Sequence, residues 1–79
     1  MTTFARLRID VPDHPGALAA VSRVLAGLAM NVVEVSVHEV EGERATDEIV
    51  VHCESMPAYD ALRAAVGAAG ADLRSVGPC

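Results

Sequence analysis

Apolar and polar residues alternate along residues 3–11 of the chain. One face of this segment carries Ala5, Leu7, Ile9 and Val11, and the other carries Arg6, Arg8 and Asp10. A period of two residues predicts a β-strand that is buried on one side. Pro12 and Pro15 follow this segment and interrupt it.

Two later segments change to a helical period. Residues 16–29 repeat apolar side chains at spacings of three and four, namely Leu18, Val21, Leu25 and Leu28. A second stripe of this kind holds Met56, Tyr59, Leu62 and Val66. Each stripe predicts a helix with one apolar face. Ser55 is the expected N-cap of the second helix, and Asn31 is expected in the turn after the first.

Residues 32–40, 45–53 and 72–76 have the pattern of further strands, and residues 77–79 are expected to fray. The inward positions of the first two are predicted to be Val33, Val35 and Val37, and Ile49, Val51 and Cys53. Cross-strand partners share a face, so these odd-numbered sets require a loop of odd length between the strands. A loop of residues 42–44 meets this requirement and pairs Glu34 with His52 and His38 with Glu48.

The predicted order of elements is therefore βαββαβ. Each strand–helix–strand half favours a right-handed crossover. Two interleaved halves give an α+β, ferredoxin-like sandwich: a four-stranded antiparallel sheet of order 4-1-3-2 with both helices on one face. Residues 1–79 are expected to form one domain. Its charged outer sheet face is expected to meet water or a second subunit.

Charge excludes some partners. The net charge is −5, and the six basic residues are arginines scattered along the chain, so neither nucleic acid nor a membrane surface is an expected partner. No apolar run reaches the length of a signal peptide or a membrane span, which favours a cytoplasmic location. Cys53 and Cys79 are far apart without a CxxC spacing, so free thiols are favoured over a disulfide.

The sequence offers little catalytic chemistry. Cys53 is expected on the core face, and no cofactor motif is present, so neither an enzyme nor a bound cofactor is expected. His38, His52, Glu34 and Glu48 share the outer face, where a cross-strand charge ladder is favoured over a metal site. His14 is favoured as a loop surface residue over a catalyst.

The loop around Asp13, His14 and Gly16 is the best candidate for a ligand site. Backbone N–H groups at the start of the following helix favour a carboxylate. Asp13 could cap that helix or accept a hydrogen bond from an ammonium group. Asn31 is expected at the same end of the sheet, and its amide both donates and accepts. Together these groups suit a zwitterion such as an amino acid.

These residues resemble the ACT domain. The resemblance covers residues 6–76 and rests on a D-x-P-G-x-L turn, residues 13–18, followed by Asn31 before a Val-rich strand. It implies a regulatory domain that dimerises through its second strand and first helix and binds an effector in that interface. The implied ligand-binding residues are Asp13, His14, Gly16, Ala17, Leu18 and Asn31. Serine-sensing members have His at the position of Val11 and Asn at that of Asp13, so serine is not the implied ligand.

We therefore expect a non-catalytic homodimer, or a higher oligomer, that binds an amino acid or similar small metabolite. Most ACT domains are tethered to an enzyme, so this chain is expected to act on a partner enzyme in trans or to be an orphan sensor. One alternative is a ligand-free assembly module that docks on a metabolic enzyme or regulator. Another is a small enzyme or metal carrier on a ferredoxin-like frame.

Overall fold

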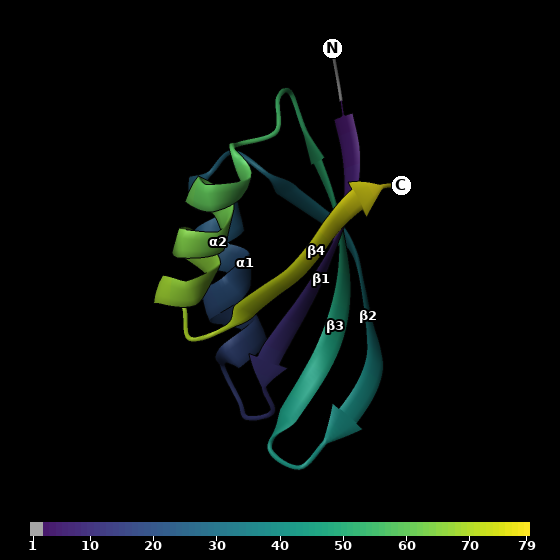
Figure 1. Ribbon diagram of the computed structural model, residues 1–79, viewed down its shortest axis with the longest axis vertical. Helices are drawn as coiled ribbons and strands as arrows, with labels where there is room; N and C mark the ends of the chain where they lie inside the picture. Colours follow the sequence, from purple (N-terminus) through teal and green to yellow (C-terminus); the bar gives the residue numbers. More distant parts are fainter. Residues whose placement is uncertain (1–2) are drawn as a thin grey trace.

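The computed structural model describes residues 3–79. In chain order it contains β1 (Thr3–Pro12), α1 (Ala17–Gly27), β2 (Asn31–Glu41), β3 (Arg44–Cys53), α2 (Tyr59–Ala68) and β4 (Asp72–Pro78). The strands form one antiparallel sheet in the order β2-β3-β1-β4. Both helices lie against one face of this sheet (Figure 1). The predicted ferredoxin-like sandwich is confirmed.

The core lies between the helices and the two central strands, β1 and β3. The predicted inward residues of β1 are all buried. Val21 and Leu25 of α1, and Leu62 and Val66 of α2, are fully buried against the sheet. The apolar residues in the first turn of each helix are not buried: Leu18 is 36% exposed and Tyr59 is 47% exposed. The apolar pattern therefore predicts the centre of each helix correctly, and two large apolar side chains remain at the surface.

A left-handed alanine ends α1. Ala29 has φ 61°, and its N–H donates to the Ala26 carbonyl oxygen at 3.0 Å. The N–H of Met30 donates to the Leu25 carbonyl oxygen, also at 3.0 Å. This pair of bonds is the Schellman motif, which satisfies carbonyls at a helix C-terminus. Because Ala29 makes the turn, Asn31 is already the first residue of β2, and its predicted role as the turn residue is wrong.

The second helix begins later than the sequence pattern suggests. Ala58, with ψ 143°, occupies the position before its first turn, and no side chain in the described part of the chain caps the helix. The prediction of Ser55 as the N-cap is therefore wrong. The physical reason is the extended backbone of Ala58, which keeps the preceding residues outside the helix. Met56 nevertheless packs against the core, as its place in the apolar stripe predicts.

The hairpin between β2 and β3 has a different register from the predicted one. Glu41 pairs with Arg44, so the loop holds two residues and not three. The register then shifts twice along β2, between Val37 and Glu39 and between Val32 and Glu34. The predicted pairs are wrong: Glu34 lies opposite Val50, and Glu48 lies opposite Ser36. The bulge at His38 restores the even register that the shared face requires.

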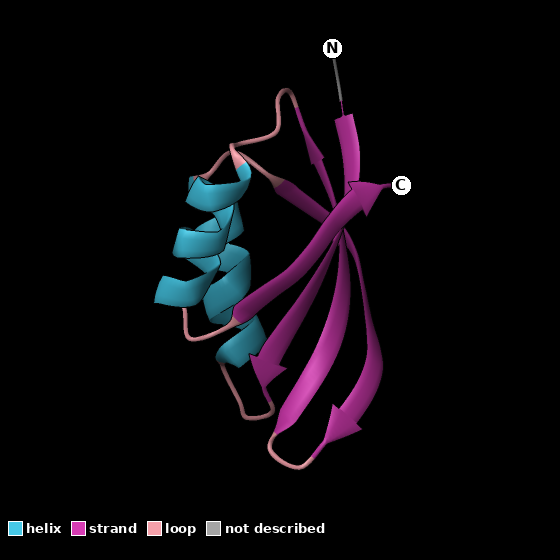
Figure 2. Ribbon diagram, in the orientation of Figure 1, coloured by secondary structure: helices cyan, strands magenta, loops and turns pink. Residues whose placement is uncertain are grey.

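Strand β2 lies at one edge of the sheet (Figure 2), and its residues are exposed along almost its whole length. Val35 and Val37 pair with Ile49 and Asp47, so they face the helix side as predicted. They are nevertheless 38% and 59% exposed, because the strand forms the edge of the sheet and is not covered by a helix. Val33 lies at a bulge and is 48% exposed. The prediction that these three valines are buried in the core is wrong for a single chain.

Strand β4 is longer than predicted. It continues to Pro78, and Gly77 and Pro78 pair with Arg6 and Ala5 of β1. The predicted fraying of these two residues is therefore wrong. A proline fits here because β4 is an edge strand that needs no N–H donor on its outer side. The register against β1 shifts near Arg74, the residue left over between Leu73 and Ser75.

Candidate functional site

The loop of residues 13–16 connects the end of β1 to the start of α1. Asp13 donates its backbone N–H to the Glu43 carbonyl oxygen at 2.6 Å, which ties the loop to the β2–β3 hairpin. The N–H of Ala17 donates to the His14 carbonyl oxygen at 3.2 Å. Gly16 precedes the helix with φ 88°. The backbone thus holds the loop at one end of the sheet.

Gly16 is explained by its backbone angle. A positive φ of this size is readily adopted by glycine and strained for other residues. A Cβ atom at this position would meet no other atom within 4 Å. Among the described residues, therefore, the positive φ favours glycine at this position, and no neighbouring atom would clash with a larger side chain's Cβ. The space beside it faces outward, next to the first turn of α1.

Asp13 does not cap α1. Among the described residues, 3–79, no side chain makes a cap hydrogen bond to the start of this helix. The sequence left two roles open for Asp13, a helix cap or an acceptor for an ammonium group, and the structure excludes the helix cap. Among residues 3–79 its carboxylate makes no hydrogen bond or ion pair, and the residue is exposed. This carboxylate is therefore available to accept hydrogen bonds from another molecule.

A small hollow lies between the loop, α1, β2 and β3. Its volume is about 160 Å³, and it is lined by Val11, Pro12, Asp13, His14, Leu18, Val37, Ala45 and Asp47. Three predicted site residues therefore meet here, namely Asp13, His14 and Leu18. Ala17 is next to Leu18 in the chain but is buried in the core. The ring of His14 lies over its own loop, with Nδ1 3.1 Å from the Pro15 carbonyl oxygen.

Asp47 is a member of this hollow that the sequence analysis missed. Its side chain is 4% exposed, and its Oδ1 atom is buried with no hydrogen-bond partner in the part of the chain described. Strand parity could have found it. Position 47 shares the inward face of β3 with Ala45 and Ile49, so the pattern puts a carboxylate among apolar residues.

Burial raises the pKa of the Asp47 carboxyl above its usual value, and the nearby Asp13 carboxylate raises it further. Both effects disfavour the ionised form. A buried carboxylate without a partner is costly to the fold. Groups of this kind concentrate at functional sites.

Asn31 lies at the other end of the sheet. It pairs with His52, which in turn lies opposite Phe4 near the start of β1. Asp13 follows the end of β1 and is bonded to the β2–β3 hairpin. The prediction that Asn31 shares an end of the sheet with the loop is wrong for a single chain, because α1 carries the chain back along the sheet before β2 begins (Figure 1).

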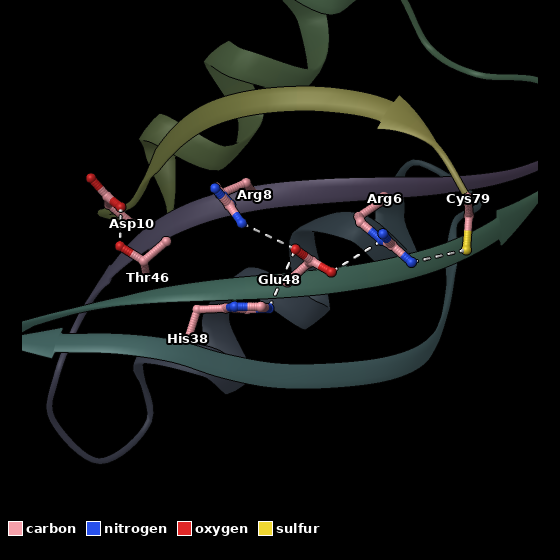
Figure 3. Close-up of polar contacts among 7 residues, drawn as sticks. All are labelled: Arg6, Arg8, Asp10, His38, Thr46, Glu48 and Cys79. Atoms are coloured by element: carbon pink, nitrogen blue, oxygen red, sulfur yellow. Dashed lines mark hydrogen bonds and ion pairs between the residues drawn. The ribbon is translucent and has the colours of Figure 1, made fainter.

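Charged residues gather on the outer face of the sheet, away from the helices. Glu48 contacts two arginines and a histidine: Arg6 Nε at 3.1 Å, Arg8 at 3.3 Å and His38 Nε2 at 3.3 Å (Figure 3). Asp10 accepts hydrogen bonds from Thr46 and Arg74 at 2.9 and 2.7 Å. Four of the six arginines that look scattered in the sequence, Arg6, Arg8, Arg44 and Arg74, are thus paired with carboxylates across strands.

The two histidines of the outer face do not come together. His38 contacts Glu48, and the ring of His52 stacks on Phe4 with centroids 4.5 Å apart. The expected contact between His38 and Glu48 therefore exists, although the strand register differs. Within residues 3–79, no group of three or more His, Cys, Asp or Glu side chains is arranged to hold a metal ion. Both cysteines are free, with Cys53 buried and Cys79 exposed.

No helix in the described range is long and apolar enough to cross a membrane.

The family model of the ACT domain matches residues 5–70 of the chain. An ACT domain protein from Streptococcus pneumoniae has a similar solved structure, with a TM-score of 0.69 and 24% identity; the match covers 95% of this chain and 88% of that one. A protein of unknown function from Galdieria sulphuraria gives a TM-score of 0.77 at 16% identity, covering 100% of this chain. No curated protein matches the chain.

A third similar structure is a formyltetrahydrofolate deformylase from Pseudomonas putida KT2440, with a TM-score of 0.71, 16% identity and 96% of this chain covered. The chain spans 46% of the Galdieria protein and 29% of the deformylase. At these identities the similarity establishes the fold only.

Proposed function

The chain belongs to the ACT domain family, and we propose that it is a non-catalytic regulatory domain that binds an amino acid at the interface of a homodimer. ACT domains are typically regulatory, ligand-binding modules. The observation that carries the proposal is the exposed apolar surface of β2 and α1, which adjoins the hollow beside Asp13.

The apolar surface consists of side chains on the helix side of the β2 edge and on the adjoining part of α1, namely Leu18, Val35, Val37 and Val40. They are between 36% and 59% exposed. Strand β2 also has a free edge, with unpaired backbone N–H and C=O groups that a second strand can pair. Apolar side chains beside an open strand edge are typical of a surface that is covered by another chain.

A second copy also explains the position of Asn31. In a two-fold dimer built on antiparallel pairing of β2 with β2, each strand begins beside the end of its partner. The partner's Asn31 would then approach residues 40 and 41, at the end of the sheet that holds Asp13. Two equivalent sites would form, each with the loop of one copy and the asparagine of the other.

In such a site the available groups suit an α-amino acid. The N-terminal turn of α1 has no side-chain cap and favours a carboxylate. Asp13 accepts hydrogen bonds from an ammonium group. The apolar wall of the hollow, which includes Val37 and Leu18, can contact an aliphatic side chain. Gly16, which has no side chain, leaves the backbone just before the helix open to the ligand.

The dimer is tested by placing a charge on the apolar surface. We expect Val37→Asp to convert the dimer to a monomer, because a charge in a close-packed apolar interface would be buried without a partner. Tyr59→Asp is the matched control, since Tyr59 is an exposed apolar residue on α2. Sedimentation equilibrium of both variants gives the result. A wild-type chain that is monomeric at high protein concentration would contradict the proposal.

Ligand binding is tested by thermal unfolding in the presence of each amino acid at millimolar concentration. A ligand that binds the folded dimer raises Tm by mass action. We expect a rise for the wild type and none for Val40→Asp, because the site needs both copies and Val40 lies on the apolar surface without lining the hollow. A stable dimer that no amino acid stabilises would favour the ligand-free assembly module instead.

A further inference from the structure

The unpartnered carboxylate of Asp47 has a role that neither the family match nor the similar structures assign. It lies in β3, on the helix side of the sheet, with its neighbours Ala45 and Ile49 both buried. Its strand partners are Ile9 on one side and Val37 on the other. In these surroundings an aliphatic side chain would be more stable, so the carboxylate opposes the stability of the fold.

The position of the Asp47 carboxylate in the wall of the hollow suggests a role in binding a ligand. Asp47 lines the hollow beside the loop, together with Asp13. Asp13 stands at the exposed rim, and Asp47 forms part of the buried wall. The rest of the lining that the two carboxylates share is mostly apolar, and it includes Val11, Leu18 and Val37. Within residues 3–79, neither carboxylate has a hydrogen-bonded or ion-paired partner.

We propose that Asp47 and Asp13 together bind the ammonium group of the ligand, so that the site selects molecules that carry a primary ammonium on a small apolar skeleton. This inference rests on the proposed function and names its ligand class. A primary ammonium has three donors and no acceptor, which matches two carboxylates that lack donors of their own. The volume of about 160 Å³ fits a small skeleton.

The proposal explains why a costly group is retained. An ammonium that enters the hollow neutralises the repulsion between the two carboxylates and supplies the hydrogen bonds that Asp47 lacks. Ligand binding therefore removes the destabilisation that Asp47 causes in the empty protein. Because Asp47 is buried, its attraction for the ammonium is stronger than it would be on the surface.

An α-amino acid and a simple amine share this chemistry, and the experiment separates them. For each amino acid that stabilises the wild type, binding is also measured for the matching amine, which lacks the carboxylate, and for the matching acid, which lacks the ammonium. L-Valine, isobutylamine and isovalerate are one such set. We expect the amine to bind and the acid not to bind. An acid that binds as well as the amino acid would overturn the inference.

The variants Asp47→Asn and Asp47→Val test the residue itself. Asparagine keeps the shape and removes the charge, and valine suits a strand position opposite Val37. We expect both variants to have a higher Tm than the wild type without ligand. We also expect Asp47→Asn to bind the amine or amino acid about tenfold more weakly, and Asp47→Val more weakly still. A residue that serves only the fold would not raise Tm and lower affinity together.

Asp60→Asn is the control, because Asp60 is an exposed aspartate in the first turn of α2 and undergoes the same chemical change. It should leave the affinity unchanged. If the wild type binds an amino acid and Asp47→Asn binds it equally well, the role of Asp47 is refuted and the proposed function stands. If the dimeric wild type binds none of the probes, the proposed function fails, and this inference fails with it.

Discussion

Asn31 and Asp13 lie at opposite ends of the sheet. Asn31 pairs with His52 beside the start of β1, whereas Asp13 follows the end of β1 and donates its N–H to the Glu43 carbonyl oxygen at 2.6 Å. All of β1 separates the two ends (Figure 1). A ligand held by both residues must therefore contact two copies of the chain. This relationship makes dimerisation a condition of binding in the proposed mechanism.

The first prediction concerns the backbone at Gly16. Its φ of 88° is in the left-handed region, where an L-residue costs about 1–2 kcal/mol. Gly16→Ala should therefore lower the free energy of unfolding by about 1 kcal/mol, although no atom blocks the added methyl group. Urea denaturation measures this change. Because the loop changes conformation, the variant should also lose the stabilisation by amino acids.

Gly67→Ala is the matched control for that prediction. Gly67 lies inside α2, where an added Cβ also meets nothing within 4 Å. Alanine is favoured over glycine in a helix by about 1 kcal/mol, so this variant should be more stable than the wild type. A loss of stability in Gly16→Ala together with a gain in Gly67→Ala would confirm that the backbone angle decides the change in the free energy of unfolding. If both substitutions changed the free energy of unfolding in the same direction, this explanation of Gly16 would be refuted.

The second prediction concerns the end of α1. Ala29 has φ 61°, in a Schellman turn where glycine is usual. Ala29→Gly should raise the free energy of unfolding by about 0.5–1 kcal/mol, since relief of backbone strain exceeds the entropy that glycine adds to the unfolded chain. Ala26→Gly, in the helix, should lower it by about 1 kcal/mol. A loss of stability in Ala29→Gly, measured by thermal unfolding, would contradict the left-handed turn.

The third prediction is a pH dependence caused by Asp47. Burial first, and then Asp13, raises the pKa of its carboxyl above the usual 3.8 in the folded chain. The folded state therefore binds the proton more tightly than the unfolded state does. By linkage, the free energy of unfolding contributed by this group falls as the pH rises from about 3.8 through the raised pKa. The penalty of Asp47 is smallest below this window and complete above it.

The comparison with Asp47→Asn isolates this contribution. The variant should exceed the wild type in stability at neutral pH, and the difference should shrink as the pH falls through the window. Asp13 and His14 also line the hollow, but both are present in the two proteins and largely cancel in the difference. Urea denaturation at a series of pH values measures it. A difference that is the same at every pH would contradict a raised pKa for Asp47.

Much of the fold follows from local pattern. The alternation in β1 and the stripes through Val21, Leu25, Leu62 and Val66 predict the core, because the periods of strand and helix are fixed by backbone geometry. The register of the β2–β3 hairpin does not follow in the same way. A two-residue loop followed by a bulge at His38 gives Val35 and Val37 the same facing as a three-residue loop without a bulge. Parity cannot separate them.

The candidate site was predictable only in part. The loop residues Asp13 and His14 meet Leu18 because they are close in sequence and lie at a strand–helix junction. Asp47 reaches the same hollow from a distant strand, although its inward parity gave a signal. The position of Asn31 depends on the direction in which β2 runs. Its approach to Asp13 requires a second copy, which the sequence of one chain does not contain.

The most direct test of the central claim is a mixing experiment with Asp13→Ala and Asn31→Ala. Neither homodimer should bind the amino acid that stabilises the wild type, because every site lacks one group. In a mixed dimer, one site combines the intact Asp13 of one copy with the intact Asn31 of the other. After equal mixing and exchange of subunits, calorimetry should detect binding in roughly a quarter of the sites. A mixture that binds no more than its two components would contradict a site shared between two copies.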